Sequence, residues 1–168
     1  MSLPERRRAI IAFGANLGDR EATIRAGLGE LDASASVKVV MVSSFYASDP
    51  VGYADQPEFI NGTAALDTVL GPEDLLSLLL AVEKRFGRVR DIPNGPRTLD
   101  LDLLFYDGES AYVSPALVLP HPRWHERGFV IAPLRDLFTD PVLAEDRRWA
   151  SIRNRLEHLG PASGIRKL

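Results

Sequence analysis

The 168-residue sequence predicts an α+β fold, with helices packed on one face of an antiparallel sheet and a C-terminal extension beyond it. Four segments have the length and composition of strands, and two amphipathic segments with clear helix ends separate them. The order is strand, helix, strand, strand, helix, strand, which is the split βαβ, or ferredoxin-like, pattern. The length suits one domain, and no repeat, linker or low-complexity segment divides residues 1–168.

The first half of this pattern begins with the apolar run AIIAF at residues 9–13, a predicted buried strand. Asp19 is the expected N-cap of the first helix, because its carboxylate can accept from the unpaired N–H groups of the first turn. Residues 37–46 are rich in β-branched side chains and predict the second strand, and residues 59–70 predict the third.

The second helix has the clearest boundary signals. Pro72 suits its first turn and Gly87 suits the residue just past its end. The fourth strand follows at residues 98–106 with the sequence TLDLDLLFY. Beyond it we expect a hairpin near residues 111–119 and a last helix near residues 148–158.

Composition and charge exclude several classes of protein. A net charge of −3 is not that of a dedicated nucleic-acid binder, which is usually basic. The absence of cysteine excludes disulfides, thiolate catalysis and cysteine-ligated metals. No apolar segment approaches the roughly 20 residues of a membrane span, and the N-terminal segment lacks the features of a signal peptide. We therefore expect a cytoplasmic monomer with small-molecule partners, and neither nucleic acid nor membrane among them.

The segment NGPRTLDLDLLFYDG, residues 94–108, places two aspartates inside an otherwise apolar strand. Side chains alternate along a strand, so Asp100 and Asp102 share one face, with Cα atoms about 7 Å apart. Two such carboxylates repel each other unless a cation compensates them, and Mg²⁺ combines a few carboxylates with water and phosphate oxygens. The pair is thus a candidate Mg²⁺ site, and the alternative is a solvated face on which it pairs with Arg97. The intervening leucines are expected to point into the core: Leu99, Leu101 and Leu103.

Two basic segments flank this strand in the sequence. The loop at residues 87–97 carries arginines whose forked donors suit phosphate oxygens: Arg88, Arg90 and Arg97. In LPHPRWHERGF, residues 119–129, His121 and Arg127 are candidates for phosphate contact. His121 and His125 have the helical spacing of a metal pair, but a proline lies between them and no third ligand is evident. A solvated surface loop is the alternative for both segments.

Residues 9–135 resemble the 6-hydroxymethyl-7,8-dihydropterin pyrophosphokinase family of folate biosynthesis. The likeness rests on five segments in the family's order: FGANLGDR, SSFYASDPVGYADQPEFIN, GRVR, NGPRTLDLDLLFYDG and LPHPRWHERGF. Among them, GPRTLDLDLL is close to a family signature. The resemblance implies a ferredoxin-like fold and transfer of the β,γ-pyrophosphoryl group of ATP to the pterin hydroxymethyl oxygen, with release of AMP. It also implies two Mg²⁺ ions held by Asp100 and Asp102.

The resemblance assigns the other site residues by position. Pterin contacts are implied for Ser48, Val51, Phe59, Asn61 and Phe129. ATP contacts are implied for Glu83, Arg88, Arg90, Arg97, Leu103, His121 and Arg127, and the three arginines join the aspartates as the catalytic set. Ordinary core packing is the alternative for the two phenylalanines. Glu83 is expected on the exposed side of its helix, where a plain surface charge is the alternative.

The implied reaction depends on alignment and charge neutralisation. The substrate hydroxyl attacks the β-phosphorus in line, while metal ions and arginines offset the charge that develops. Either Asp100 accepts the hydroxyl proton, or metal coordination acidifies the hydroxyl. Loops 48–58 and 87–97 are expected to close over the substrates. Asn94 stands in the second loop where familiar members of the family often have tryptophan.

Two other functions compete with this interpretation. A ferredoxin-like module that binds RNA or a regulatory small molecule is one of them, and an RNA-binding module would expose aromatic side chains on a basic sheet face. Here the candidate face carries Asp100 and Asp102 instead. A nucleotidyltransferase with an Asp-x-Asp metal site is the other, and it would release pyrophosphate where a pyrophosphokinase releases AMP.

Overall fold

The computed structural model describes residues 5–49, 57–87, 98–108 and 110–168. The strands in these residues are β1 (Arg7–Ala15), β2 (Val37–Val42), β3 (Tyr46–Ser48), β4 (Phe59–Thr68), β5 (Asp100–Tyr106), β6 (Tyr112–Val113), β7 (Val118–Leu119) and β8 (Ile165–Lys167). The α-helices are α1 (Arg20–Ala33), α2 (Pro72–Arg85), α3 (Gly128–Leu137), α4 (Pro141–Ala144) and α5 (Ala150–His158). Two short 3-10 turns, Trp124–Glu126 and Arg147–Trp149, precede α3 and α5.

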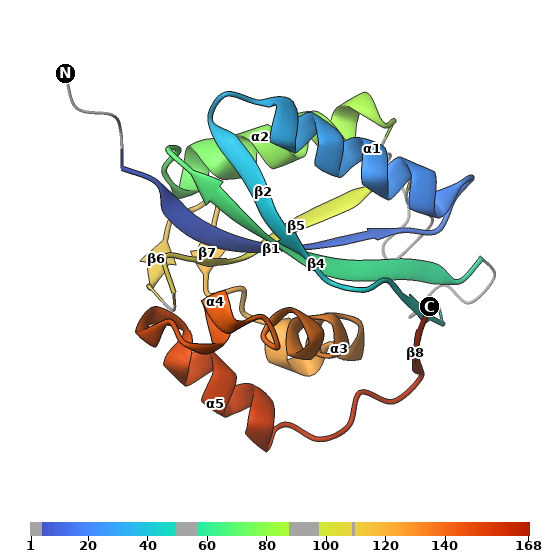
Figure 1. Ribbon diagram of the computed structural model, residues 1–168. Coiled ribbons are helices and arrows are strands. Elements are labelled where there is room, and N and C mark those ends of the chain that lie inside the picture. Colours follow the sequence, from blue (N-terminus) through green and yellow to red (C-terminus); the bar gives the residue numbers. More distant parts are fainter. Residues whose placement is uncertain (1–4, 50–56, 88–97, 109) are drawn as a thin grey trace.

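Six of the described strands form one antiparallel sheet. Its order is β5-β1-β4-β3-β8, and β2 pairs with another part of β4 (Figure 1). β6 and β7 form a separate hairpin, at the place that the sequence predicted. The prediction of a mixed fold with helices and an antiparallel sheet is therefore confirmed.

Helices cover both faces of the sheet. α1 and α2 lie on one face, while α3, α4 and α5 lie on the other (Figure 1). The two helices predicted within the sheet pattern do share one face, while the C-terminal extension, which the sequence analysis placed on neither face, forms a second layer. The physical reason is that the strands also bury apolar side chains on their second face, among them Ile10, Ala65 and Phe105. These side chains need a cover, and the C-terminal helices provide it.

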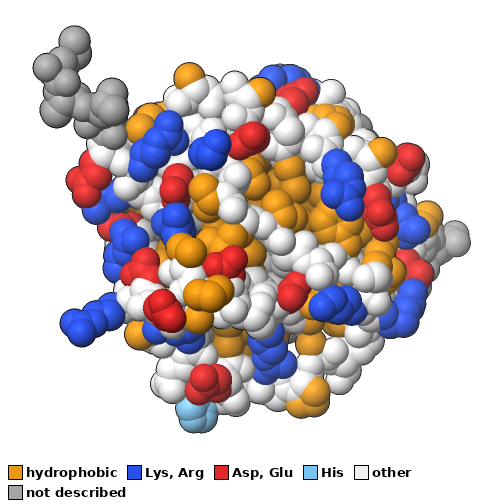
Figure 2. Space-filling view, viewed as in Figure 1, with side chains coloured by type: hydrophobic (Ala, Val, Ile, Leu, Met, Phe, Trp, Pro, Cys, Tyr) orange, Lys and Arg blue, Asp and Glu red, His pale blue; other side chains and the backbone are white. Residues whose placement is uncertain are grey.

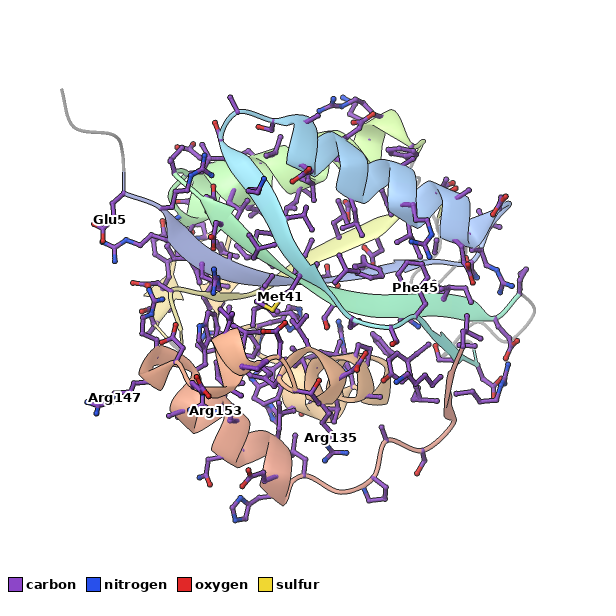
Figure 3. All side chains as sticks on the ribbon, viewed as in Figure 1. Glu5, Met41, Phe45, Arg135, Arg147 and Arg153 are labelled. Carbon is purple, nitrogen blue, oxygen red and sulfur yellow. The ribbon has the colours of Figure 1, made fainter. Side chains whose placement is uncertain are left out.

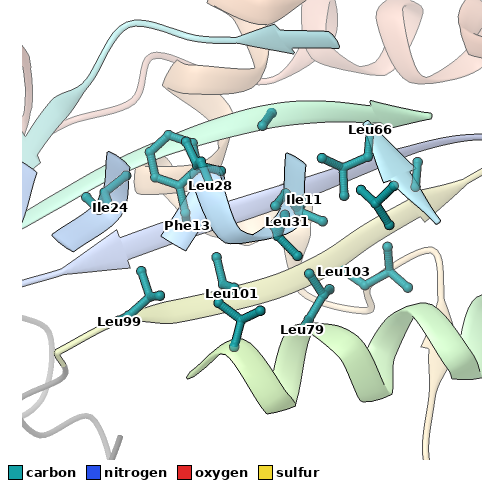
Figure 4. Close-up of a cluster of buried hydrophobic side chains, with 14 of the residues drawn as sticks. Ile11, Phe13, Ile24, Leu28, Leu31, Leu66, Leu79, Leu99, Leu101 and Leu103 are labelled. Atoms are coloured by element: carbon teal, nitrogen blue, oxygen red, sulfur yellow. The ribbon is translucent and has the colours of Figure 1, made fainter. Parts of the chain in front are cut away.

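The first core lies between the sheet and helices α1 and α2. Leu99, just before β5, and Leu101 and Leu103 of β5 point into it, near Leu79 of α2 (Figure 4). These three leucines are at most 3% exposed, which confirms the alternation predicted for this segment. Each such burial stabilises the fold by about 1.5–3 kcal/mol. The same alternation turns the two aspartates of β5 toward the other face.

The second core is built around Trp149, which contacts Phe105 and Phe138 edge-on at 6.2 Å between ring centroids. Arginines on the outside of this layer bind backbone carbonyl groups (Figure 3). Arg135 donates to the carbonyl oxygens of the α5 C-terminal end, and Arg153 donates to two carbonyls at 2.7 Å in the segment before α5. The C-terminal layer is thus a packed and hydrogen-bonded part of the fold.

The segment predicted as one strand over residues 37–46 forms two strands. Side-chain bonds divert the backbone between them: the Ser43 hydroxyl accepts from the Thr63 N–H at 2.9 Å. The Asp136 carboxylate of α3 accepts from the Ser44 N–H at 2.6 Å. Because these bonds replace part of the ladder, β2 ends at Val42 and β3 begins at Tyr46.

The helix ends agree with the sequence signals. The Asp19 carboxylate accepts from the Ala22 N–H at 3.2 Å and caps α1. Pro72 begins α2, and Gly87 follows its end with a φ of 74°, a conformation that favours glycine.

The described surface carries charges of both signs. Figure 2 shows lysines and arginines interspersed with acidic residues on the face that it displays, without a single basic patch. Among the described residues, no helix combines the length and apolar character that a membrane span requires.

Gly62 of β4 lies against the ring of Phe13 on the first core's side, and a Cβ at this position would overlap that ring. We expect Gly62→Ala to lower the free energy of unfolding by about 1–3 kcal/mol, because the ring has to move within a packed core. Urea denaturation measures this change. The matched control is Gly29→Ala on α1, where a Cβ meets nothing within 4 Å. It is expected to be neutral or to stabilise the helix by up to about 1 kcal/mol. Equal unfolding free energies for the two variants would contradict this description of the core.

Candidate active site

The candidate site lies on the sheet face that also carries the second core. In the cross-strand register, Asn61 of β4 and Asp100 of β5 both lie opposite Gly14 of β1. Directly paired residues point to the same face of a sheet. Asn61, Gly14 and Asp100 therefore form a row across three strands. α3 packs next to this row, where the Thr63 hydroxyl donates to the Pro133 carbonyl at 3.0 Å.

Asp102 lies on the same face as Asp100, two residues further along β5, opposite Ala12. This register confirms the prediction that the two aspartates share a face. Both side chains are half-buried. Arg127, the residue before α3, places its Nη1 3.9 Å from the Asp102 Oδ2, with side chains 25% and 35% exposed. At that distance and exposure the ion pair is weak, but it brings a guanidinium, the group predicted to bind phosphate, next to the carboxylates.

His121 also belongs to this cluster. Its backbone N–H donates to the Leu104 carbonyl of β5 at 2.9 Å. Burial and the charges of Arg127 and Arg123 lower the pKa of the imidazole, while the nearby Asp100 acts in the opposite direction. The ring Nδ1 accepts from the Arg123 N–H at 3.1 Å. A neutral imidazole in this arrangement carries its proton on Nε2, which makes Nε2 a hydrogen-bond donor.

Three of the predicted pterin residues lie together at the other end of the row. The Asn61 Nδ2 donates to the Ser48 Oγ at 2.7 Å, and the two residues are 6% and 4% exposed. Phe59 is half-buried and pairs directly with Ser48. Phe129, in the first turn of α3, is partly buried against the second core with the Arg127 guanidinium 5.6 Å from its ring.

Glu83 corrects the sequence prediction. It was expected on the exposed side of α2, but it is 2% exposed. Its Oε2 accepts from the N–H of Leu101 at 2.7 Å, between the two aspartates of β5. The sequence did contain the signal, because Glu83 follows the buried Leu79 by four residues and so lies on the same side of the helix. The contact fixes the strand that carries the carboxylates.

Two residues of the FGANLGDR segment were missed by the sequence analysis, which gave them no role. Asn16 is 1% exposed, and its Nδ2 donates to the Pro57 carbonyl at 3.1 Å. Arg20 donates to the Glu58 carbonyl at 2.7 Å. Together they hold the residues that lead into β4, immediately before Phe59. Their polar types within a short glycine-containing motif were the available signal.

The remaining predicted residues have simpler positions. The Leu103 side chain is 3% exposed and lies in the first core. His125 packs edge-on against Trp124, with 5.8 Å between the ring centroids. In the described part of the chain, no group of three or more histidines or acidic residues is arranged to hold a metal ion. Four predicted residues lie outside the described residues: Val51, Arg88, Arg90 and Arg97.

The sheet lies between two helical layers, and one of its faces carries two carboxylates beside an arginine and a neutral histidine. This combination defines a candidate site for a metal-bound phosphate. The family model described as 7,8-dihydro-6-hydroxymethylpterin-pyrophosphokinase (HPPK) matches residues 10–139. The chain therefore belongs to this family.

Individual relatives agree with the family match. A protein named 2-amino-4-hydroxy-6-hydroxymethyldihydropteridine pyrophosphokinase from Pseudomonas aeruginosa is 47% identical over 140 residues, 83% of this chain and 86% of its own length. A protein of the same name from Bacillus subtilis is 45% identical over 129 residues, 77% of each chain. The crystal structure of Plasmodium falciparum HPPK-DHPS with pteroate superposes with a TM-score of 0.63 at 12% identity, over 82% of this chain and 40% of that longer one. At this identity the superposition shows the shared fold alone.

Replacing Glu83 tests its structural role. We expect Glu83→Ala to lower the free energy of unfolding by about 1–3 kcal/mol, because the buried N–H of Leu101 loses its acceptor. Glu83→Gln keeps an acceptor oxygen and is expected to lose less. Lys84→Ala, at an exposed position next to it, is the control and should stay within about 0.5 kcal/mol of the wild type. An alanine variant at position 83 as stable as this control would contradict the anchoring role.

Proposed function

We propose that this protein transfers the pyrophosphoryl group of ATP to the hydroxymethyl group of 6-hydroxymethyl-7,8-dihydropterin, giving the pterin diphosphate and AMP in folate biosynthesis. The observation that carries the proposal is the carboxylate pair of β5, Asp100 and Asp102, on one face of a chain that belongs to the pyrophosphokinase family. The same face carries three of the residues proposed for the pterin, Ser48, Phe59 and Asn61.

Asp100 and Asp102 are the residues that would hold Mg²⁺. The donor set fits this ion, because Mg²⁺ binds through one or two carboxylates and completes its shell with water and substrate phosphates. A pair of half-buried carboxylates is therefore sufficient, and two ions can share it with a triphosphate. When bound, the ions offset charge on the phosphate oxygens and orient the triphosphate.

On the ATP side, we propose that Arg127 and His121 contact phosphate oxygens. The guanidinium of Arg127 offers forked donors next to Asp102, and the neutral imidazole of His121 offers its Nε2 proton. Arg88, Arg90 and Arg97, which lie outside the described residues, are proposed to bind the migrating pyrophosphoryl group. The side chains of Glu83 and Leu103 are buried. We therefore propose that they act on ATP indirectly, by fixing the position of β5.

On the pterin side, we propose that the ring edge meets Asn61. Its Nδ2 gives one hydrogen to Ser48, which leaves one N–H and the carbonyl oxygen for a heterocycle with matching donors and acceptors. Phe59 and Phe129 are proposed to contact the faces of the ring, because aromatic planes stack well with flat heterocycles. Val51 is proposed as an apolar contact.

In the proposed reaction the pterin hydroxyl oxygen attacks the β-phosphorus in line. A new O–P bond forms, the bond from the β-phosphorus to the bridging oxygen of the α-phosphate breaks, and AMP leaves with that electron pair. The hydroxyl proton passes to Asp100 or to solvent. The protein contributes alignment of the two substrates and exclusion of water, which would otherwise hydrolyse ATP.

We also propose that residues 1–168 form a single domain of the ferredoxin-like type. The support is the chain order β1, α1, β2, β4, α2, β5, with these four strands in one antiparallel sheet and both helices on one face. The short β3 and the C-terminal layer are additions to this arrangement.

A coupled assay for AMP release tests the proposal. With ATP and Mg²⁺ present, we expect AMP to form only when 6-hydroxymethyl-7,8-dihydropterin is added, and chelation of Mg²⁺ by EDTA to stop it. We expect Asp102→Asn to reduce the rate by about 100-fold or more, because it removes a charge that serves ions and not packing. Asp74→Asn, at an exposed position on α2, is the matched control and should keep the wild-type rate.

Two results would contradict the proposal. Release of pyrophosphate in place of AMP would indicate a nucleotidyltransferase. Near-normal AMP release by Asp102→Asn, with a circular dichroism spectrum like that of the wild type, would remove the carboxylate pair from the site.

A further inference from the structure

Gly14 lies in the interior of β1, between the two halves of the proposed site. Its cross-strand partners are Asn61 on one side and Asp100 on the other. Neighbouring strands place paired Cα atoms about 5 Å apart, so the two polar side chains rise from the same face about 10 Å from each other. Gly14 contributes no side chain between them.

The backbone does not require a glycine here. The glycines with positive φ in the described residues are Gly18, Gly87, Gly108 and Gly164, and Gly14 is not among them. A glycine in the interior of a strand normally weakens it, because it packs nothing and loses more conformational freedom on folding. We therefore attribute the glycine at position 14 to a need for space above the strand, and not to a backbone conformation that only glycine adopts.

The missing side chain makes room for the amide of Asn61. A Cβ on Gly14 would lie 2.6 Å from the Asn61 Oδ1, which is too close for any real contact. The Asn61 amide cannot yield without loss, because its Nδ2 is bonded to the Ser48 Oγ at 2.7 Å and the residue is 6% exposed. A side chain at position 14 would turn the amide and break or lengthen that hydrogen bond.

We propose that Gly14 is a positioning residue for the pterin substrate. It holds the Asn61 amide in one orientation, with the oxygen over β1 and the nitrogen on Ser48, and it keeps open the space between the pterin edge and the carboxylates. This inference rests on the proposed function, because it assumes that Asn61 meets the pterin. It extends that function by assigning a residue that makes no polar contact with either substrate.

The test is the kinetics of Gly14→Ala in the AMP-release assay, with each substrate varied while the other is saturating. We expect the KM for the pterin to rise about tenfold, the effect of losing one well-oriented hydrogen bond. The KM for ATP and kcat are expected to stay within about threefold, because the carboxylates keep their positions. Gly29→Ala on α1, where a Cβ meets nothing within 4 Å, is the matched glycine control.

A second variant, Ser48→Ala, disturbs the same amide without adding bulk at position 14. It is expected to raise the pterin KM as well. The double variant should raise it by less than the product of the two single effects, since both act through one amide group. A purely structural effect of either substitution would lower kcat and the melting temperature without this non-additive change in the pterin KM.

The outcomes separate this inference from the proposed function. If the wild type and Gly29→Ala release AMP and Gly14→Ala has an unchanged pterin KM, the positioning role is wrong and the function stands. Failure of Gly14→Ala to fold would also overturn the role, because the Cβ would then not be accommodated by a turn of Asn61. Absence of pterin-dependent AMP release in the wild type would overturn the function itself.

Discussion

The repulsion between two neighbouring carboxylates on β5 is the constraint on which the rest of the structure depends. Asp100 and Asp102 lie on one face, half-buried, so water alone screens them incompletely. The fold holds them there because the leucines that alternate with them fill the first core, and because Glu83 accepts a hydrogen bond from the backbone between them. Packing on one face of the strand thus maintains an unfavourable charge arrangement on the other. In the proposed function, cations and phosphate oxygens are the partners that turn this arrangement into a binding site.

The C-terminal layer has a role in the site as well as in the fold. It covers the second face of the sheet with apolar side chains, and at its edge it places Arg127 next to Asp102, His121 against β5 and Phe129 beside Arg127. α3 is fixed against the sheet through the Pro133 carbonyl and the Asp136 carboxylate. Without this layer the apolar side chains on the second face would be exposed, and the proposed site would lack the donors of His121 and Arg127.

Much of this arrangement could be predicted from the sequence, because it follows from local rules. Strand alternation placed the aspartates on one face and the leucines on the other, and capping residues marked the ends of α1 and α2. The errors concern contacts between distant segments. The division of the predicted second strand depends on a bond from Asp136, which lies 92 residues away from Ser44. The cover on the second face likewise depends on tertiary packing, whereas the burial of Glu83 could have been predicted from its helical spacing to Leu79.

The central claim is that the carboxylate pair binds the nucleotide through divalent cations. Calorimetric titration with ATP, in the absence of pterin, tests it most directly when done with Mg²⁺ and again with EDTA. We predict that the wild type binds ATP about tenfold or more tightly with Mg²⁺, and that the double variant Asp100→Asn, Asp102→Asn loses this difference while keeping its fold. A double variant that retains the full Mg²⁺ dependence would contradict the account.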